Sequence, residues 1–177
     1  MTQRKLLLDA AAIRSALARI AHEIAERNVS SSSLVIVGVQ RGGVHLAHRL
    51  SAELKNIWGH PVTVGELDVS MHRDDLDNRL LNHIHPTAIP IDITGKTVIL
   101  VDDVLFSGRT TRAAMDALND FGRPQSIQLA VLIDRGHREL PIKADFVGKN
   151  LPTSKQESID VVLNEEGIED AVHLQTT

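Results

Sequence analysis

The stretch Val98–Thr111, VILVDDVLFSGRTT, decides the fold of this chain. The apolar, β-branched run over 97–101 is typical of a buried strand, and the adjacent acids Asp102 and Asp103 close it. A loop rich in hydroxyl side chains follows, and the pattern then predicts a helix over about 110–121. Open α/β sheets bind their ligands at the carboxyl ends of the strands, so a binding site is expected at this loop.

The loop has the chemistry of a phosphate cradle beside a sugar clamp. Gly108 permits a close backbone approach, and the N–H groups and positive dipole end of the helix attract an anion. Asp102 and Asp103 can accept hydrogen bonds from two vicinal hydroxyls, such as those of a ribose. Hydroxyls that can donate to phosphate oxygens belong to Ser107, Thr110 and Thr111. A polar strand end with a simple N-cap is the plainer interpretation, but it leaves this combination unexplained. Neither GxxxxGK[ST] nor GxGxxG occurs in the sequence.

Strands and helices alternate along the rest of the chain. The run Leu34–Val39 (LVIVGV) is apolar throughout and too short for a buried helix, so it predicts a central strand. Such strands, alternating with helices, indicate an α/β fold with a mostly parallel central sheet flanked by helices. We expect a single domain over residues 1–177. The other expected elements are helices over 9–28, with Asp9 as N-cap, and over about 44–56, and strands over 62–69, 127–133, 144–147 and 159–163.

Residues 70–95 form a long polar segment between two of these strands. The segment contains several histidines, Pro86 and Pro90, and it shows no strong periodicity. A stretch of this length inside a compact domain predicts a mobile functional loop or a small hairpin rather than a linker. Thr94-Gly95-Lys96 has half the letters of a Walker loop but precedes a strand, so it predicts a turn.

The composition disfavours several classes of protein. The 177 residues carry 19 Lys and Arg against 23 Asp and Glu, and the formal net charge of −4 excludes a uniformly basic coat for nucleic acid. The absence of Cys excludes disulfides and thiolate sites. With 3 Phe, 1 Trp and no Tyr, the chain is unlike RNA modules that stack bases on aromatic platforms. No apolar run approaches the length of a membrane span, so we expect a cytoplasmic protein without a membrane partner.

Several motifs resemble one known family. The stretch Val98–Thr111 resembles the motif with which type I phosphoribosyltransferases bind 5-phosphoribosyl-1-diphosphate (PRPP). RDDL at 73–76, DRGHRELPI at 134–142 and VGKNLPTS at 147–154 resemble the pyrimidine operon attenuation regulators that are also uracil phosphoribosyltransferases. The first helix, IRSALARIAHEIAERN, belongs to the same pattern, and the resemblance runs from about residue 9 to 158. It implies the type I phosphoribosyltransferase fold with a flexible loop and a small hood.

The resemblance implies two activities. One is the conversion of uracil and PRPP to UMP and pyrophosphate, with Mg²⁺ carried mainly by PRPP or pyrophosphate. The other is UMP-responsive binding to the leader RNA of a pyrimidine (pyr) operon, which attenuates transcription. Two alternatives are a uracil phosphoribosyltransferase without an RNA-binding role and a nucleotide-sensing protein without catalysis. Relatives form dimers or higher assemblies, so a homo-oligomer is expected, and an apolar patch around Leu46, Leu50 and Trp58 is compatible with one.

The resemblance also implies roles for single residues. Asp102 and Asp103 would hold the ribose hydroxyls, and residues 107–111 the 5-phosphate. The loop 40–42 would bind pyrophosphate, and the segment carrying Arg73 would close over it. Arg135 would lie beside the uracil or nucleotide end. The implied catalytic residues are Asp102, Asp103, Arg41 and Arg73, with no metal ligand set in the protein. The implied substrate-binding residues are Gln40, Arg41, Gly42, Arg73, Asp102, Asp103, Val104, Leu105, Phe106, Ser107, Gly108, Arg109, Thr110, Thr111 and Arg135.

Three positions depart from the pattern of the relatives. Purine phosphoribosyltransferases have an acid, suited to handling a proton on the base, where this chain has Phe106. Catalysis is therefore expected to rely on a ring nitrogen that loses its proton more readily, as in uracil. His72 stands where the relatives usually have Tyr, and Gln40 where they have Thr. Both changes lie in the predicted pyrophosphate region, so they bear on catalytic efficiency rather than on the fold.

A local basic face is the candidate for RNA binding. The resemblance implies an RNA-binding surface formed by two regions of the chain, in which Ala18 replaces a Thr that is frequent in relatives. Phosphates would supply the affinity and loop bases the specificity. From charge alone, a solvated helix face is the favoured alternative. The residues concerned are Arg19, His22, Arg27, Arg138 and Lys143.

The 9 histidines raise the question of a metal site. His83 and His85, with His72 upstream, could place ligands on one side of a hairpin. However, the sequence has no HExxH motif and no obvious carboxylate partner spacing. Solvated loop histidines are therefore the favoured interpretation, and His137 within DRGHREL has no assigned role.

Overall fold

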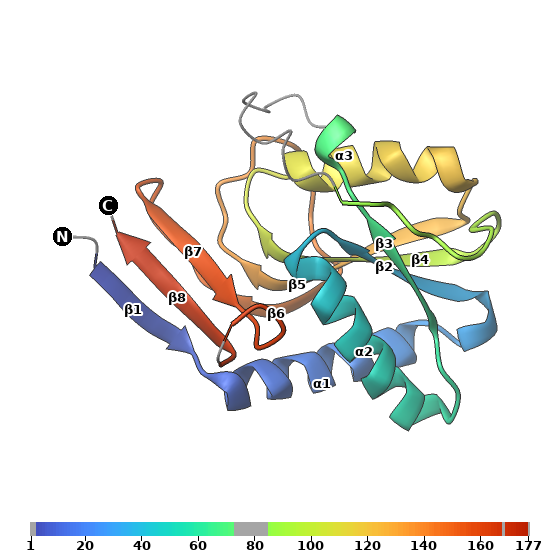
Figure 1. Cartoon of the computed structure of the whole chain (residues 1–177), viewed down its shortest axis with the longest axis horizontal. Helices are drawn as coiled ribbons and strands as arrows, with labels where there is room; N and C mark the ends of the chain where they lie inside the picture. The colour runs from blue at the N-terminus through green and yellow to red at the C-terminus, as the bar shows by residue number, and fades with distance from the viewer. Residues whose placement is uncertain (1–2, 73–84, 168, 177) are drawn as a thin grey trace.

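The computed structural model describes residues 3–72, 85–167 and 169–176 and contains a five-stranded sheet with strand order β3-β2-β4-β5-β6 (Figure 1). Each neighbouring pair of strands in this sheet is parallel. The predicted α/β fold with a parallel central sheet is therefore confirmed. The strands are β2 (Leu34–Val39), β3 (Thr63–Leu67), β4 (Thr97–Leu105), β5 (Ser126–Asp134) and β6 (Phe146–Asn150).

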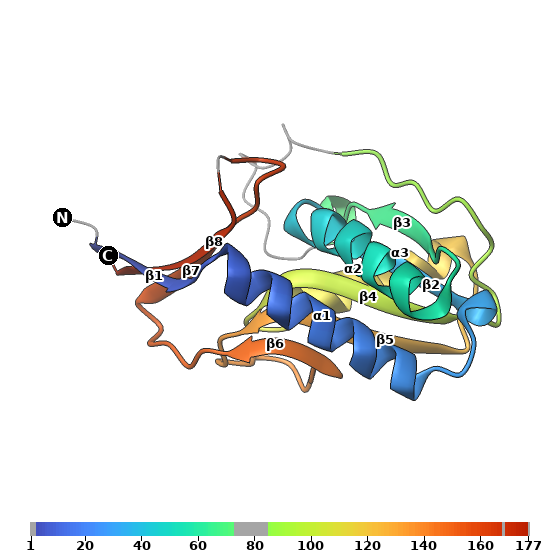
Figure 2. The same cartoon turned by 90° about the horizontal axis from the view of Figure 1, so that it is seen from below.

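Helices cover both faces of this sheet (Figures 1 and 2). Because side chains alternate along a strand, β4 serves two cores: Ile99 packs with α1 and α2 on one face, and Leu100 packs with α3 on the other. The predicted cap of α1 is confirmed, since Asp9 Oδ1 accepts a hydrogen bond of 2.8 Å from the N–H of Ala12. The helices are α1 (Ala10–Arg27), α2 (Gly42–Trp58) and α3 (Arg109–Leu118).

A second, antiparallel sheet stands beside the main one, with strand order β1-β8-β7. We identify it with the expected hood. Its strand β7 (Glu157–Val162) corresponds to the strand predicted over 159–163, whereas β1 (Gln3–Leu8) and β8 (Ala171–Thr176) were not predicted. Figure 1 shows these two strands side by side, although they come from opposite ends of the chain. Leu8 of β1 and Val172 of β8 pack into the same hydrophobic core as the buried side chains of α1, and they connect the hood to the main sheet.

The strand β4 is longer than predicted. Asp102 and Asp103 lie within it rather than closing it, because the pairing with β5 continues to Leu105, which is opposite Asp134. The prediction that the strand ends at residue 101 was therefore wrong. Since successive side chains of a strand point to opposite faces, the two acids diverge.

The prediction of an apolar surface patch around Leu46, Leu50 and Trp58 was also wrong. Leu46 and Leu50 are each only 1% exposed and belong to the core between α2 and the sheet, while Trp58 is partly buried against the same core. Helical spacing identified an apolar face, but it could not show which neighbour covers that face. The homo-oligomer stays a prediction.

Residues 73–84 of the segment predicted to be a loop or hairpin are not described. Arg73, His83 and the RDDL motif lie outside the described residues, so the choice between loop and hairpin stays a prediction. At the end of the segment, the predicted turn at Thr94-Gly95-Lys96 is confirmed, with a Gly95 φ of +73°. Among the helices that the structure describes, none combines the length and apolar character needed to cross a membrane.

Candidate active site

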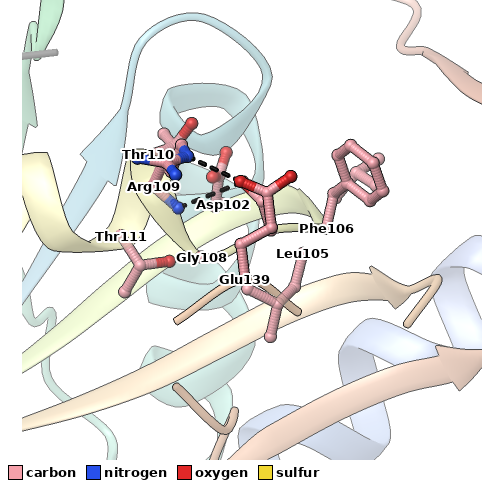
Figure 3. Close-up of a pocket in the computed structure, with 10 residues that line it drawn as sticks. Asp102, Leu105, Phe106, Gly108, Arg109, Thr110, Thr111 and Glu139 are labelled. Atoms are coloured by element: carbon pink, nitrogen blue, oxygen red, sulfur yellow. Dashed lines mark hydrogen bonds and ion pairs between the residues drawn. The ribbon is translucent and has the colours of Figure 1, made fainter. Parts of the chain in front are cut away.

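A cavity of about 420 Å³ lies at the carboxyl end of β4, beside the start of α3 (Figure 3). Its wall comes from the end of β4, the loop after it, the first turn of α3 and the loop after β5. All of the lining residues except Glu139 belong to the set that the sequence assigned to substrate binding. They are Asp102, Val104, Leu105, Phe106, Ser107, Gly108, Arg109, Thr110, Thr111 and Glu139.

The loop before α3 is held in a shape that requires glycine. Gly108 has a φ of +91°, and a Cβ at this position would lie 3.2 Å from the side chain of Ile142. The carbonyl of Ser107 accepts hydrogen bonds from the N–H groups of Glu139 and Leu140, at 3.0 and 3.1 Å. The N-cap residue of α3, Gly108, has no side chain to cap the helix, and the first-turn residues Arg109–Thr111 line the cavity, so the positive end of the helix faces it. This arrangement can hold an anion.

The two adjacent acids face different surroundings. Asp102 is 9% exposed and lines the cavity. Asp103 instead faces the start of α2, because a Cβ on Gly42 would lie 2.5 Å from its Oδ2. Burial raises the pKa of Asp103, although its Oδ1 accepts a hydrogen bond of 2.7 Å from the N–H of Val104. The structure thus brings Asp102 into the cavity and Asp103 against the predicted pyrophosphate loop.

The predicted pyrophosphate loop, residues 40–42, joins β2 to α2. The N–H of Gln40 donates to the carbonyl of Leu67 at 2.9 Å, and its side-chain amide donates to Glu66 at 3.3 Å. The side chain of Arg41 is 63% exposed, and its Nε lies 3.9 Å from a carboxylate oxygen of Glu166. Arg41 therefore projects from a fixed backbone, next to Asp103, with its charge accessible to a ligand.

Arg135 lies behind the cavity rather than in its wall. Its guanidinium stacks on the ring of Phe106, 4.1 Å from the ring centroid. Arg135 is 7% exposed and donates hydrogen bonds to Thr153 Oγ1 and to the carbonyls of Ser154 and Glu157, at 3.0, 3.1 and 2.7 Å. Phe106 is 38% exposed and lines the cavity. The structure therefore places Arg135 as a support for the Phe106 ring.

Glu139 is a candidate site residue that sequence reasoning missed. Its Oε2 accepts a hydrogen bond of 2.7 Å from Arg109 Nε, and Figure 3 shows the two side chains facing each other. The loop reaches this position through two left-handed residues, Gly136 and His137, with φ angles of +78° and +61°. The DRGHREL motif signalled that this loop was important. It did not indicate that the turn brings Glu139 back to Arg109.

Of the residues predicted to bind RNA, those on α1 lie beside the segment that carries Lys143, whereas Arg138 is held in the loop after β5. Arg19 and Arg27 are exposed on α1, and they pair with Glu23 at 2.8 Å and Asp145 at 2.6 Å. Arg138 is only half-buried, but its donors go to Asp134, at 2.5 Å, and to the carbonyls of Phe106 and Ile142, at 3.0 and 2.9 Å. Arg138 therefore stabilises the loop after β5. The exposed members of the predicted set are Arg19, His22 and Arg27 on α1 and Lys143 before β6.

Comparison with known proteins decides the family. Residues 3–166 match the phosphoribosyl transferase domain. The bifunctional protein PyrR of Bacillus subtilis is 55% identical over 168 residues, which cover 93% of each chain. The bifunctional protein PyrR of a Roseiflexus species is 59% identical over 162 residues, covering 91% of this chain and 88% of the relative. The chain belongs to the PyrR family of phosphoribosyltransferases. The resemblance noted from the motifs is thereby confirmed.

Solved structures agree with this fold. A hypoxanthine-guanine phosphoribosyltransferase from Bacillus anthracis superposes with a TM-score of 0.73 over the whole of both chains, at 19% identity. A Trypanosoma cruzi hypoxanthine phosphoribosyltransferase in complex with IMP gives a TM-score of 0.67 over 85% of this chain and 77% of that one, at 24% identity. At such identities the likeness concerns the fold, which is the type I phosphoribosyltransferase fold expected for a PyrR family member.

Proposed function

We propose that this PyrR family member transfers the phosphoribosyl group of PRPP to uracil and also binds pyr leader RNA in response to UMP. The observation that carries the enzymatic part is the cavity at 102–111, where an acid, a loop of hydroxyls and the start of a helix meet. The 5-phosphate of a pentose fits the loop, and the ribose hydroxyls fit Asp102. The word "bifunctional" in the names of the relatives supports the pairing of the two functions.

The transfer exchanges one bond to the ribose for another. The bond from C1 to a pyrophosphate oxygen breaks, a bond from C1 to N1 of uracil forms, and the N1 proton passes to solvent or to the departing pyrophosphate. Positive charge develops on the sugar and negative charge on the leaving group. In our proposal, residues 107–111 fix the 5-phosphate, Asp102 orients the ribose, and Arg41 stabilises the leaving group. Removing one such stabilising donor typically raises a barrier by about 3 to 4 kcal/mol.

Two assigned residues act at the edge of this scheme. Asp103 lies against the loop of Arg41, so we assign it to the pyrophosphate side of the ribose rather than to the phosphate cavity. Arg73 lies outside the described residues, and its role in closing over pyrophosphate follows from the resemblance alone. Closure would exclude water, which otherwise hydrolyses the activated sugar.

Mg²⁺ fits the site as an ion that the substrate brings. Within the described part of the chain, no group of three or more His, Asp or Glu side chains could hold a metal ion. The carboxylate of Asp102, which lines the cavity, is an oxygen donor of the kind Mg²⁺ prefers, and the diphosphate would supply most of the other oxygens. When bound, Mg²⁺ neutralises negative charge on the leaving group.

The base end of the proposed site is apolar. Phe106 occupies the position at which purine relatives have an acid, and its ring is fixed by the guanidinium of Arg135 at 4.1 Å. With an aromatic ring at this position, deprotonation rests on the acidity of the uracil ring nitrogen. This supports a pyrimidine rather than a purine as the accepted base.

The enzymatic proposal is tested by uracil-dependent release of pyrophosphate. Asp102→Asn is expected to lower turnover at least a hundredfold while leaving the unfolding transition intact. Asp116→Asn, a charge change on the exposed side of α3, is the matched control and should keep wild-type turnover. Full activity of Asp102→Asn would refute the site. If the wild-type protein binds UMP but releases no pyrophosphate, it is a nucleotide sensor without catalysis.

The RNA-binding proposal is supported by the exposed α1 residues Arg19, His22 and Arg27. Filter binding to the leader RNA of the chain's own pyr operon tests it. Affinity should rise when UMP occupies the cavity, because binding at two linked sites is reciprocal. Arg27→Gln is expected to weaken RNA binding and flatten its salt dependence. RNA affinity that does not respond to UMP would contradict the regulatory part while leaving the enzymatic part standing.

A further inference from the structure

The described residues of the turn between β7 and β8, 164–167 and 169–170, lie along a basic stripe that follows α2. Arg41, His45 and Arg49 are spaced by four residues, so they follow one side of the helix from the pyrophosphate loop onward. The carboxylates that meet this stripe come from Glu165, Glu166 and Asp170. The hood is therefore joined electrostatically to the loop that carries Arg41.

The contacts are tight at one end of the stripe. Arg49 donates to both oxygens of Asp170, at 2.7 and 2.8 Å, to Glu165 at 2.9 Å and to Asn164 at 2.8 Å. The side chain of Asp170 is only 8% exposed, and the hydrogen bonds from Arg49 lower its pKa. This end anchors the turn to α2.

The contacts are loose at the other end. Glu166 lies 3.1 Å from His45 Nε2 but 3.9 Å from Arg41 Nε, and the Glu166 and Arg41 side chains are 41% and 63% exposed. The negative charge of Glu166 also contributes to the raised pKa of half-buried Asp103, which places Glu166 within electrostatic range of the site. Because Glu166 has His45 as a second partner, it can yield Arg41 without being left unpaired.

We propose that Glu166 is an internal competitor for Arg41, which holds this guanidinium when the site is empty and weakens the binding of pyrophosphate. The inference rests on the proposed role of the 40–42 loop in binding that anion. A carboxylate beside Arg41 repels an incoming anion, and it also competes with that anion for the positive charge of the Arg41 guanidinium. Glu166 thereby acts as a positioning residue for Arg41 that favours release of the leaving group over its retention.

Calorimetric titration with inorganic pyrophosphate, at one fixed Mg²⁺ concentration, tests the proposal. Glu166→Gln is expected to bind pyrophosphate about three- to fivefold more tightly than the wild type, as suits an exposed pair. Glu169→Gln is the matched control: it removes the same charge from the same turn, and Glu169 makes no ion pair with a described residue. Its affinity should equal that of the wild type. In the Arg41→Gln background, the second change Glu166→Gln should give a smaller gain than in the wild type, because only the repulsion of the anion by the carboxylate is then removed.

The possible outcomes distinguish a failure of the competitor role of Glu166 from a failure of the proposed pyrophosphate site. If Arg41→Gln weakens pyrophosphate binding but Glu166→Gln leaves it unchanged or weaker, the competitor role is wrong and the proposed site stands. An equal gain in Glu169→Gln would also overturn the competitor role, because the effect would then be one of net charge. If Arg41→Gln leaves pyrophosphate affinity unchanged, the assignment of the 40–42 loop fails, and this inference fails with it.

Discussion

Arg109 and Glu139 form an ion pair of 2.7 Å between two walls of the candidate active site. Arg109 opens α3 after the hydroxyl loop, and Glu139 belongs to the loop after β5, so the pair joins segments that are distant in sequence (Figure 3). Their side chains are 34% and 54% exposed, and solvent therefore screens the attraction. The carboxylate of Glu139 nevertheless lines the cavity in which we place a phosphate.

Glu139→Gln is expected to tighten UMP binding about two- to threefold, because the phosphate meets less negative charge in the cavity. The free energy of unfolding should change by less than about 1 kcal/mol, since an exposed ion pair contributes little. Calorimetric titration with UMP and urea denaturation check the two parts. Glu26→Gln, an exposed change on α1, serves as control. Weaker UMP binding in Glu139→Gln would show that the carboxylate supports the phosphate site rather than opposing it.

Asp103→Asn is expected to raise the thermal unfolding midpoint at pH 7 while lowering turnover. Burial raises the pKa of Asp103 in the folded protein, so the folded state binds this proton more tightly than the unfolded state does. The ionised acid therefore costs the fold stability once the pH exceeds its ordinary pKa of about 3.9. The advantage of the variant should grow from about pH 4 upward and level off above the raised pKa. A variant that melts below the wild type at pH 7 contradicts this account of Asp103.

Asp170→Asn is expected to lower the free energy of unfolding by about 3 kcal/mol at pH 7. Arg49 is half-buried, and the substitution removes the negative charge of its partner at position 170. Hydrogen bonds from Arg49 lower the pKa of Asp170 in the folded protein. The stabilisation is therefore fully present above the ordinary pKa of about 3.9, and it is lost as the pH falls through the lowered pKa. Urea denaturation at neutral and acid pH should show the variant and the wild type converging in acid. Asp160→Asn, which disrupts an exposed pair with Arg4, should cost less than about 1 kcal/mol.

Local patterns predicted the main sheet and most of the candidate cavity. The run Leu34–Val39 forms β2 with the predicted bounds, because an apolar run that is too short for a buried helix is stable as a strand inside a sheet. The cavity lining over 104–111 was also anticipated, since contiguous residues stay together at the end of a strand. In both cases the deciding information lies within a few residues of the element concerned.

Features that depend on distant partners were not predictable. Strands β1 and β8 pair Leu6 with His173, and neither short run identifies a partner at the other end of the chain. The same applies to Glu139 and to Glu166, which reach the site only through turns whose path the sequence does not reveal. Asp102 and Asp103 point to opposite faces because pairing with β5 extends β4 beyond them, and the sequence of β4 alone does not show this pairing.

A crystal structure of the chain with UMP tests the central claim most directly. We expect the phosphate within hydrogen-bond distance of residues 107–111, with a ribose hydroxyl at Asp102 and the base on the side of Phe106. UMP bound outside the cavity at 102–111, or bound there with its base rather than its phosphate in the hydroxyl loop, would contradict it.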